Sequence, residues 1–194
     1  MEKIHLLIVE DDPIIAVDLE DRLKEMGYDV VGIVDRGEQV PAFFEKAQPP
    51  DMLLLDIQLK GEWTGIDTAR HIQKSQQLPI IFLTSNSDEA TFREAKQVQP
   101  QAFLTKPYRG KDLKHAIELA ISQFAQQEGS LDKIQEDNNA ILLNDRLFIK
   151  VKDRMVRLFW NDILWLEADN YYCKIVTREK EFLVTKTLKK FSAQ

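Results

Sequence analysis

Charged side chains stand at the ends of three short apolar runs in this sequence. Asp11 and Asp12 follow the first run, Asp56 closes a run of four large apolar residues, and Lys106 follows a later run. Carboxylates that lie close together repel one another, so they need a bound cation or raised pKa values. Mg²⁺ suits such a group because it prefers oxygen ligands and keeps several of its waters. A carboxylate can also be a nucleophile that forms an aspartyl-phosphate, with a metal ion and a lysine neutralising the charge.

The hydrophobic pattern predicts the elements that would bring these charges together. Five apolar runs are typical of strands, at 3–9, 28–34, 52–56, 79–84 and 102–105. Five further segments are predicted to be helices, at 13–26, 37–47, 66–72, 88–98 and 112–124. This alternation predicts an α/β fold with a doubly wound, five-stranded parallel sheet. Ligands bind at the carboxyl edge of such sheets, where the strand-end charges and Thr84, which ends the fourth strand, are expected to meet.

Composition and charge describe a globular protein with an uneven charge distribution. Apolar residues make up 44% of the 194 residues, which is enough for a core. The net charge of −6 combines −10 before Asn144 with +4 from Asn144 onward, and this asymmetry indicates two modules. The single cysteine, Cys173, excludes an intramolecular disulfide and fits a reducing compartment. No apolar run approaches the roughly 18 residues of a membrane span, so we expect a cytoplasmic protein without a membrane partner.

This ordered set of residues resembles the receiver domain of bacterial response regulators, the phosphate-accepting half of two-component signalling. The resemblance covers roughly residues 3–124 and rests on motifs at four strand ends, namely Glu10-Asp11-Asp12, Asp56, Thr84-Ser85 and Lys106-Pro107. It implies a flavodoxin-like fold for a receiver domain over residues 1–125. It also implies that Asp56 accepts a phosphoryl group from a sensor histidine kinase. No enzymatic activity is expected beyond Mg²⁺-dependent self-phosphorylation from a donor and autodephosphorylation.

Further roles around Asp56 follow from the same resemblance. Mg²⁺ would be held by Asp11, Asp12, Asp56 and the backbone carbonyl of Gln58. Lys106 would pair with the phosphoryl group, Thr84 would bond one of its oxygens, and Phe103 would move between exposed and buried positions. Thr84 could instead be an ordinary strand-end residue, and Phe103 an ordinary core residue. The phosphorylated protein would form a homodimer through the helices at 88–98 and 112–124 and the strand at 102–105.

The loop after Asp56 departs from the pattern of the family. It lacks the proline that many receivers carry, and residues 60–63 make it slightly longer. In the family, the positions of Gln58 and Asn86 tune how long the phosphoryl group lasts. The sequence therefore leaves the phosphoryl lifetime open.

After residue 125 the pattern changes from helices to short strands. Residues 126–143 are mostly polar and read as a linker, followed by predicted strands at 148–152, 155–159, 163–167, 172–177 and 182–185. Residues 144–194 resemble the first part of a LytTR domain, the DNA-binding output of LytR/AlgR-type response regulators. The family's later basic segment has no counterpart before Gln194, so a truncated output domain is expected. Weak candidates for DNA phosphate contacts, each of which could equally be a solvated charge, are Arg154, Arg157, Lys186, Lys189 and Lys190.

Three functions compete for these features. The first is a phosphorylation-switched transcription regulator that binds DNA through the complete output domain. The second is a receiver whose β-rich part binds a protein instead of DNA. The third is a phosphatase or phosphotransferase with an aspartyl nucleophile. Such enzymes usually carry that nucleophile after the first strand with a second Asp two residues later, so the adjacent Asp11 and Asp12 and the distant Asp56 argue against the third function.

Overall fold

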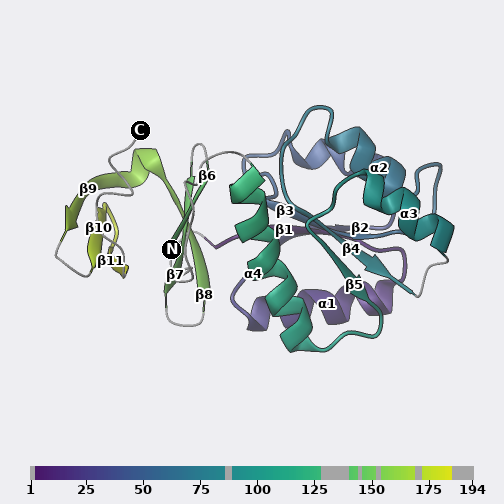
Figure 1. The fold of residues 1–194 in the computed structure, drawn as a ribbon, viewed down its shortest axis with the longest axis horizontal. Helices are drawn as coiled ribbons and strands as arrows, with labels where there is room; N and C mark the ends of the chain where they lie inside the picture. Colours follow the sequence, from purple (N-terminus) through teal and green to yellow (C-terminus); the bar gives the residue numbers. More distant parts are fainter. Residues whose placement is uncertain are drawn as a thin grey trace. The chain divides into compact units, whose positions relative to one another are not determined.

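The computed structural model describes residues 3–85, 89–127, 140–143, 146–151, 154–168 and 172–184. The chain divides into two compact units, one of residues 4–124 and one that starts at residue 125 (Figure 1). Among the helices described, none is both long enough and apolar enough to cross a membrane.

The first unit is built on a parallel sheet in the order β2-β1-β3-β4-β5. Its strands are β1 (His5–Val9), β2 (Asp29–Val34), β3 (Met52–Asp56), β4 (Ile80–Thr84) and β5 (Ala102–Thr105). The residues of β1, β3 and β4 are buried along their whole length because helices and turns cover both faces of the sheet. The predicted doubly wound, flavodoxin-like sheet is therefore confirmed.

Four α-helices accompany this sheet in the described residues: α1 (Pro13–Glu25), α2 (Gly65–Ile72), α3 (Glu89–Gln97) and α4 (Gly110–Gln127). In Figure 1, α1 and α4 lie on one side of the sheet, and α2 and α3 lie on the other. One core cluster joins Leu53, Leu55 and Phe82 of the sheet to Ile66 of α2 and Ala95 of α3. The apolar faces of both helices are thus buried against the strands that end at the predicted site.

The predicted helix at 37–47 is wrong. The chain forms two short 3₁₀ turns there, η1 (Gly37–Gln39) and η2 (Pro41–Phe43). Pro41 lies in the middle of the range, and a proline can neither donate the helical hydrogen bond nor fit beside the carbonyl four residues earlier. Phe43 and Phe44 still pack against the core cluster, so the apolar spacing reflects packing without a helix.

The second unit contains two three-stranded antiparallel sheets, which confirms the mostly-β character predicted for it. One sheet consists of β6 (Ala140–Leu143), β7 (Arg146–Val151) and β8 (Arg154–Phe159). After the 3₁₀ turn η3 (Trp160–Asp162), the other consists of β9 (Ile163–Ala168), β10 (Cys173–Thr177) and β11 (Glu181–Val184). Residues of both sheets, among them Ile149, Val156, Cys173 and Ile175, share one buried cluster.

The linker predicted at 126–143 is shorter in the structure. Helix α4 continues to Gln127, and Ala140–Leu143 form β6, which pairs with β7. Four apolar residues can become a strand when a neighbouring strand supplies the hydrogen bonds, a partner that local sequence does not reveal. The rest of the predicted linker, 128–139, lies outside the described residues.

Candidate functional site

The candidate site lies at the carboxyl edge of the parallel sheet. Asp56 is the last residue of β3 and Thr84 the last of β4, while Glu10 follows β1 and Lys106 follows β5. Because parallel strands end on the same side, these four residues meet although 96 positions separate the first from the last. Glu10, Asp56 and Lys106 border a cavity of about 390 Å³, whose lining also includes Asp11, Asp12, Gln58, Lys60 and Ser85, the residue after Thr84.

Lys106 joins two buried carboxylates of this cavity. Its Nζ lies 2.6 Å from Oδ2 of Asp56 and 2.5 Å from Oε2 of Glu10. The exposed fraction of the side chain is 10% for Lys106, 8% for Asp56 and 1% for Glu10. The backbone N–H of Lys106 donates to the carbonyl of Thr84 at 2.7 Å, and the peptide bond to Pro107 is cis. The lysine predicted to pair with a phosphoryl group therefore already contacts the predicted acceptor.

The pKa values of Glu10 and Lys106 reflect both their burial and their attraction for each other. Burial raises the pKa of Glu10, and the nearby Asp56 charge adds to this, although the hydrogen bond from Lys106 opposes it. Burial alone would lower the pKa of Lys106, but hydrogen bonds to Asp56 and Glu10 outweigh it, so the pKa lies above its ordinary value. Burial also raises the pKa of Tyr108 to about 12, with Glu10 contributing. The ammonium of Lys106 thus lies between the buried carboxylates of Glu10 and Asp56, which favour its charged form.

Three carboxylates are arranged as ligands for a cation. Glu10, Asp11 and Asp56 each offer an oxygen, and these oxygens lie within 4.8 Å of one another. Carboxylate oxygens are hard ligands, so the donor set suits Mg²⁺. The backbone N–H of Gln58 donates to Oδ1 of Asp56 at 3.0 Å, which brings the backbone of Gln58 beside the group.

The structure gives Asp12 a different role from the predicted one. Its Oδ1 accepts the backbone N–H groups of Ile14 at 2.9 Å and Ile15 at 3.3 Å, so it is the N-cap of α1. Asp12 lines the cavity but is not among the three clustered carboxylates, and Glu10 takes its place there. The predicted ligand set did not include Glu10, although the structure places it in this acidic group. The available signal was its position as the first residue after β1, directly at the sheet edge.

Thr84 and Phe103 occupy the β4–β5 side of the site. Thr84 is 7% exposed at the end of β4. Phe103 of β5 is half-buried against the core, with its ring centroid 5.7 Å from that of Phe82 and 4.8 Å from that of Phe92. Phe92 of α3 is 44% exposed, so this aromatic contact reaches from the core to the surface. Asn86 lies outside the described residues.

The loop between β3 and α2 is fixed by contacts that the sequence did not indicate. Oε1 of Glu38, on η1, accepts the backbone N–H groups of Glu62 at 2.5 Å and Trp63 at 2.9 Å. Gly61 has φ +113°, a left-handed conformation that favours glycine. At Gly65, the first residue of α2, a Cβ atom would lie 2.0 Å from the carbonyl oxygen of Asp56. The start of α2 therefore packs closely on the backbone of Asp56, and only glycine allows that approach.

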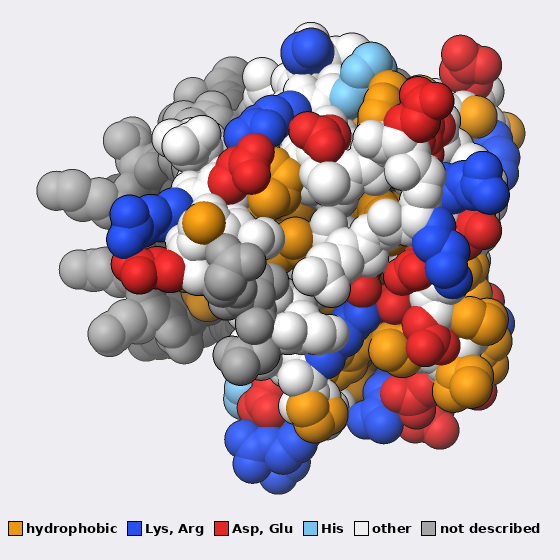
Figure 2. Space-filling view, turned by 90° about the vertical axis from the view of Figure 1, so that its right-hand side faces the viewer, with side chains coloured by type: hydrophobic (Ala, Val, Ile, Leu, Met, Phe, Trp, Pro, Cys, Tyr) orange, Lys and Arg blue, Asp and Glu red, His pale blue; other side chains and the backbone are white. Residues whose placement is uncertain are grey.

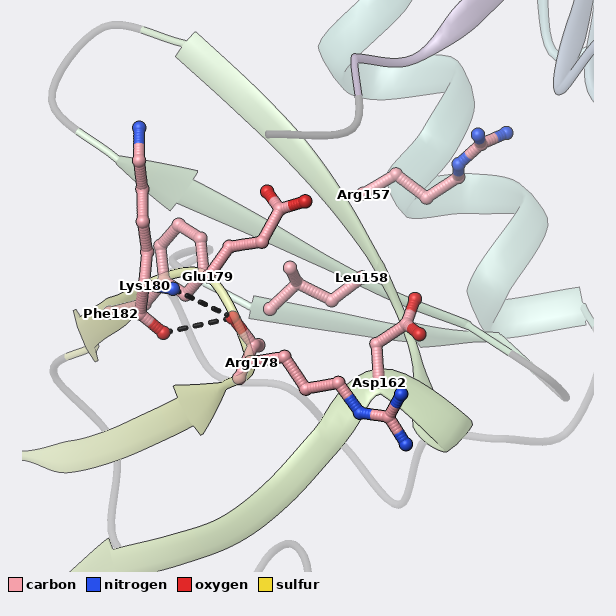
Figure 3. Close-up of a pocket in the computed structure, with 8 residues that line it drawn as sticks. Arg157, Leu158, Asp162, Arg178, Glu179, Lys180 and Phe182 are labelled. Carbon is pink, nitrogen blue, oxygen red and sulfur yellow. Dashed lines mark hydrogen bonds between the residues drawn. The ribbon is translucent and has the colours of Figure 1, made fainter.

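The second unit has a smaller cavity of about 190 Å³ (Figure 3). It lies beside the turn between β10 and β11, where Thr177 and Lys180 bond each other, and its charged lining residues are Arg157, Asp162, Arg178, Glu179 and Lys180. Charges of both signs line it, which gives no clear preference for an anion. The cavity therefore does not by itself identify a ligand.

Few of the candidate DNA contacts can be placed. The guanidinium of Arg157 lies 4.8 Å from the ring centroid of Phe159, an arrangement typical of a cation–π contact. The side chain of Arg154 and all of Lys186, Lys189 and Lys190 lie outside the described residues. The face drawn in Figure 2 belongs mainly to the first unit, and its described acidic and basic side chains are interspersed; it therefore does not test these candidate contacts of the second unit.

Comparisons with known proteins concern the first unit. The model of the response regulator receiver domain family matches residues 6–118. The chain is 35% identical over 120 residues to the transcriptional regulatory protein PdtaR of Mycobacterium tuberculosis, a match covering 62% of this chain and 58% of PdtaR. It is 29% identical over 123 residues to the phyllosphere-induced regulator PhyR of Methylorubrum extorquens, covering 63% of this chain and 45% of PhyR. The aligned part thus spans about half the length of these curated relatives.

Solved structures agree with this result. The signal receiver domain of a modulated diguanylate cyclase from Desulfovibrio desulfuricans is 38% identical with a TM-score of 0.61, covering 66% of this chain and 100% of that one. The receiver domain of sensor histidine kinase PA1611 from Pseudomonas aeruginosa, described with a magnesium ion in its active-site cleft, is 27% identical with a TM-score of 0.55. That match covers 61% of this chain and 97% of the other. The LytTR assignment of residues 144–194 stays a prediction.

Proposed function

The chain belongs to the response regulator receiver domain family, and on this basis we propose that Asp56 accepts a phosphoryl group from a sensor histidine kinase. The observation that carries the proposal is the position of Asp56 at the end of β3, beside Lys106 and within the group of three carboxylates. Both of its oxygens are held, Oδ2 by Lys106 and Oδ1 by the N–H of Gln58. The nucleophile is thereby oriented before a donor arrives.

In the proposed step, a carboxylate oxygen of Asp56 attacks the phosphorus of a phosphohistidine. The new O–P bond forms while the P–N bond breaks, and the imidazole leaving group takes up a proton. The ammonium of Lys106, now beside the carboxylate of Asp56, would then pair with a phosphoryl oxygen, which lies two bonds beyond the attacking carboxylate oxygen. Thr84 ends the adjacent strand β4, and we propose that its hydroxyl bonds one of those oxygens.

The residues present fit Mg²⁺ at this edge. Glu10, Asp11 and Asp56 would hold it, together with the backbone carbonyl of Gln58. When bound, Mg²⁺ neutralises charge on the carboxylates and on the transferred phosphoryl group. The chain's own contribution is to hold the carboxylates of Glu10, Asp11 and Asp56 together in one cavity with Lys106, whose ammonium pairs with Glu10 and Asp56.

Labelling with acetyl phosphate in the presence of Mg²⁺ tests the proposal, with intact-protein mass spectrometry as the readout. We expect one phosphoryl group on the wild-type protein and none on Asp56→Asn. Asp18→Asn is the matched control, since Asp18 is an exposed residue of α1 whose carboxylate pairs with Arg22. Undiminished labelling of Asp56→Asn would show that another residue is the acceptor.

The proposed consequence of phosphorylation is a change of the surface formed by α3, β5 and α4. Phe103 links the core to Phe92 on α3, so a shift of its ring would alter an exposed side chain of that helix. We propose that this surface forms a homodimer and that Thr84 and Phe103 transmit the change. Analytical ultracentrifugation with and without acetyl phosphate measures the change in oligomeric state.

For the second unit we propose a DNA-binding output of the LytTR type that regulates transcription. A protein-binding output is the alternative, and it is favoured by the exposed apolar side chains of Leu164, Trp165 and Leu183, which are 50%, 55% and 63% exposed. Fluorescence anisotropy with labelled DNA separates the two. Binding that weakens steeply with salt supports DNA contact, whereas no salt-dependent binding favours a protein partner.

We propose no catalytic turnover beyond self-phosphorylation and autodephosphorylation. Asp56 follows the third strand in sequence and lies 44 positions beyond Asp12, unlike the closely spaced nucleophile and acid of aspartyl phosphatases. A chromogenic phosphoester with Mg²⁺ tests this point, since sustained hydrolysis would indicate a phosphatase.

A further inference from the structure

Lys60 reaches back from the loop after β3 to the acidic group at the end of β1. Its Nζ lies 3.1 Å from the carbonyl oxygen of Asp11 and 3.3 Å from Oδ2 of the same residue. The Lys60 side chain is 66% exposed, whereas that of Asp11 is 24% exposed. The lysine thus places its ammonium on one of the three clustered carboxylates while most of its side chain stays in water.

The two lysines of the cavity contact different members of the acidic group. Lys106 contacts Glu10 and Asp56 from inside, where its side chain is 10% exposed, and Lys60 contacts Asp11 from outside. All three carboxylates that could hold a cation therefore already have a lysine within 3.3 Å. The Lys60 contact is the weaker of the two, because water screens exposed ion pairs.

The backbone around Lys60 is held on both sides. Before it, the N–H of Gln58 bonds Asp56, and after it, Glu38 accepts the N–H groups of Glu62 and Trp63. Gly61, in its left-handed conformation, makes the turn between these anchors. The exposed side chain of Lys60 can therefore change conformation while these backbone hydrogen bonds stay in place. It can leave Asp11 by rotation about its own bonds, without moving the loop.

From this arrangement we infer that Lys60 is a built-in competitor of the metal ion: it occupies Asp11 in the metal-free protein and must leave for Mg²⁺ to bind. Asp11 cannot accept Mg²⁺ at bonding distance and keep the ammonium on the same oxygen without strong repulsion between the two cations. Lys60 therefore lowers the affinity for Mg²⁺ and raises the Mg²⁺ concentration at which Asp56 becomes reactive. This inference rests on the proposed function, since it concerns the same site.

Isothermal titration calorimetry with MgCl₂ tests the inference on the whole chain, without any phosphoryl donor. We expect Lys60→Gln to bind Mg²⁺ about two- to tenfold more tightly than the wild-type protein, which is the range for removing one exposed competing charge. Lys60→Arg keeps the cation and is expected to bind like wild type. Lys74→Gln removes a charge from an exposed lysine after α2 that lacks the contact with Asp11, and it controls for net charge. The gain in Lys60→Gln should shrink as NaCl is added.

Equal or weaker Mg²⁺ binding by Lys60→Gln would overturn the inference, because a lysine that merely supports the loop gives that result. The same gain in Lys74→Gln, or an absence of Mg²⁺ binding in every variant, would also overturn it. The proposed function is judged separately by acetyl phosphate. Labelling of Asp56 with unchanged Mg²⁺ affinity refutes only the role of Lys60, whereas tighter Mg²⁺ binding without labelling refutes only the acceptor role.

Discussion

The cavity at the sheet edge of the receiver unit and the cavity of the second unit hold their charges differently. At the sheet edge, Lys106 lies between the nearly inaccessible carboxylates of Glu10 and Asp56. In the second unit, Arg157 is buried, but most of the charged lining residues are exposed, among them Arg178, Glu179 and Lys180 of one short turn. Buried charges must be paired and strongly oriented, whereas exposed charges of both signs contribute little to binding or stability. The comparison identifies the first cavity as the one that is preorganised for a charged ligand.

The largest expected effects come from substitutions in the two hydrophobic cores. They test whether the two units unfold independently. Phe82 is fully buried in the receiver core, and Phe82→Ala should lower the free energy of unfolding of that unit by about 3–5 kcal/mol. Ile175→Ala, in the core of the second unit, should destabilise the second unit by about 2–5 kcal/mol. Differential scanning calorimetry should show each variant lowering a different transition. One transition that moves in both variants would mean that the units unfold together.

A lysine in each cavity provides the next comparison. Lys106→Met should slow labelling of Asp56 by acetyl phosphate about 100-fold or more, because it removes the cation that faces the developing phosphoryl charge. Lys180→Met, in the second cavity, is the matched control and should leave the rate unchanged. The measurement is the initial rate of phosphorylation by mass spectrometry. Similar rates for Lys106→Met and wild type would remove the functional distinction between the cavities.

Residues fixed by the parallel sheet could be predicted from the sequence. Asp56 and Lys106 follow apolar strands, and parallel strands all end at one edge, so their approach needs no knowledge of side-chain packing. Other features depend on tertiary contacts. Which of three successive acids, Glu10, Asp11 and Asp12, enters the cavity depends on how the chain turns into α1.

The unpredicted features share this dependence on distant partners. The carboxylate of Glu38 accepts hydrogen bonds from backbone N–H groups of the β3–α2 loop, about 25 positions later in the chain. Backbone groups leave no pattern in the sequence, so this contact could not be predicted. Strand β6 exists because β7 pairs with it, so its four apolar residues alone were insufficient. The spacing of Val40, Phe43 and Phe44 matched a helix, but Pro41 prevents one, and the side chains reach the core from 3₁₀ turns.

Mg²⁺ should affect the stability of the two units differently, by a smaller amount than the core substitutions. At a Mg²⁺ concentration about 100 times its dissociation constant, the receiver unit should gain about 2.7 kcal/mol of stability, since only its folded state assembles the three carboxylates. The calorimetric transition of the second unit should not move. Excess EDTA should reverse the shift, and Asp11→Asn should reduce it by about half or more, since a tenfold weaker site still gains about 1.4 kcal/mol at that concentration. A shift of both transitions would place a Mg²⁺ site in the second unit as well.

The smallest expected effect is a change in stability that distinguishes the role of Asp12 from that of its neighbour Asp11. Asp12→Ala should destabilise the receiver unit by about 1 kcal/mol through loss of the α1 cap, while Mg²⁺ affinity changes only modestly. Asp11→Asn should do the opposite, lowering Mg²⁺ affinity at least about tenfold with little effect on the cap. Chemical denaturation and isothermal titration calorimetry measure the two quantities.

Asp12→Asn decides between the role seen in the structure and the role implied by the family resemblance. Asparagine also caps helices well, so this variant should keep both the stability and most of the Mg²⁺ affinity of the wild-type protein. If Asp12→Asn instead loses Mg²⁺ as strongly as Asp11→Asn, the carboxylate of Asp12 must contribute to the metal site despite its bonds to Ile14 and Ile15. The group of Glu10, Asp11 and Asp56 would then be an incomplete description of that site.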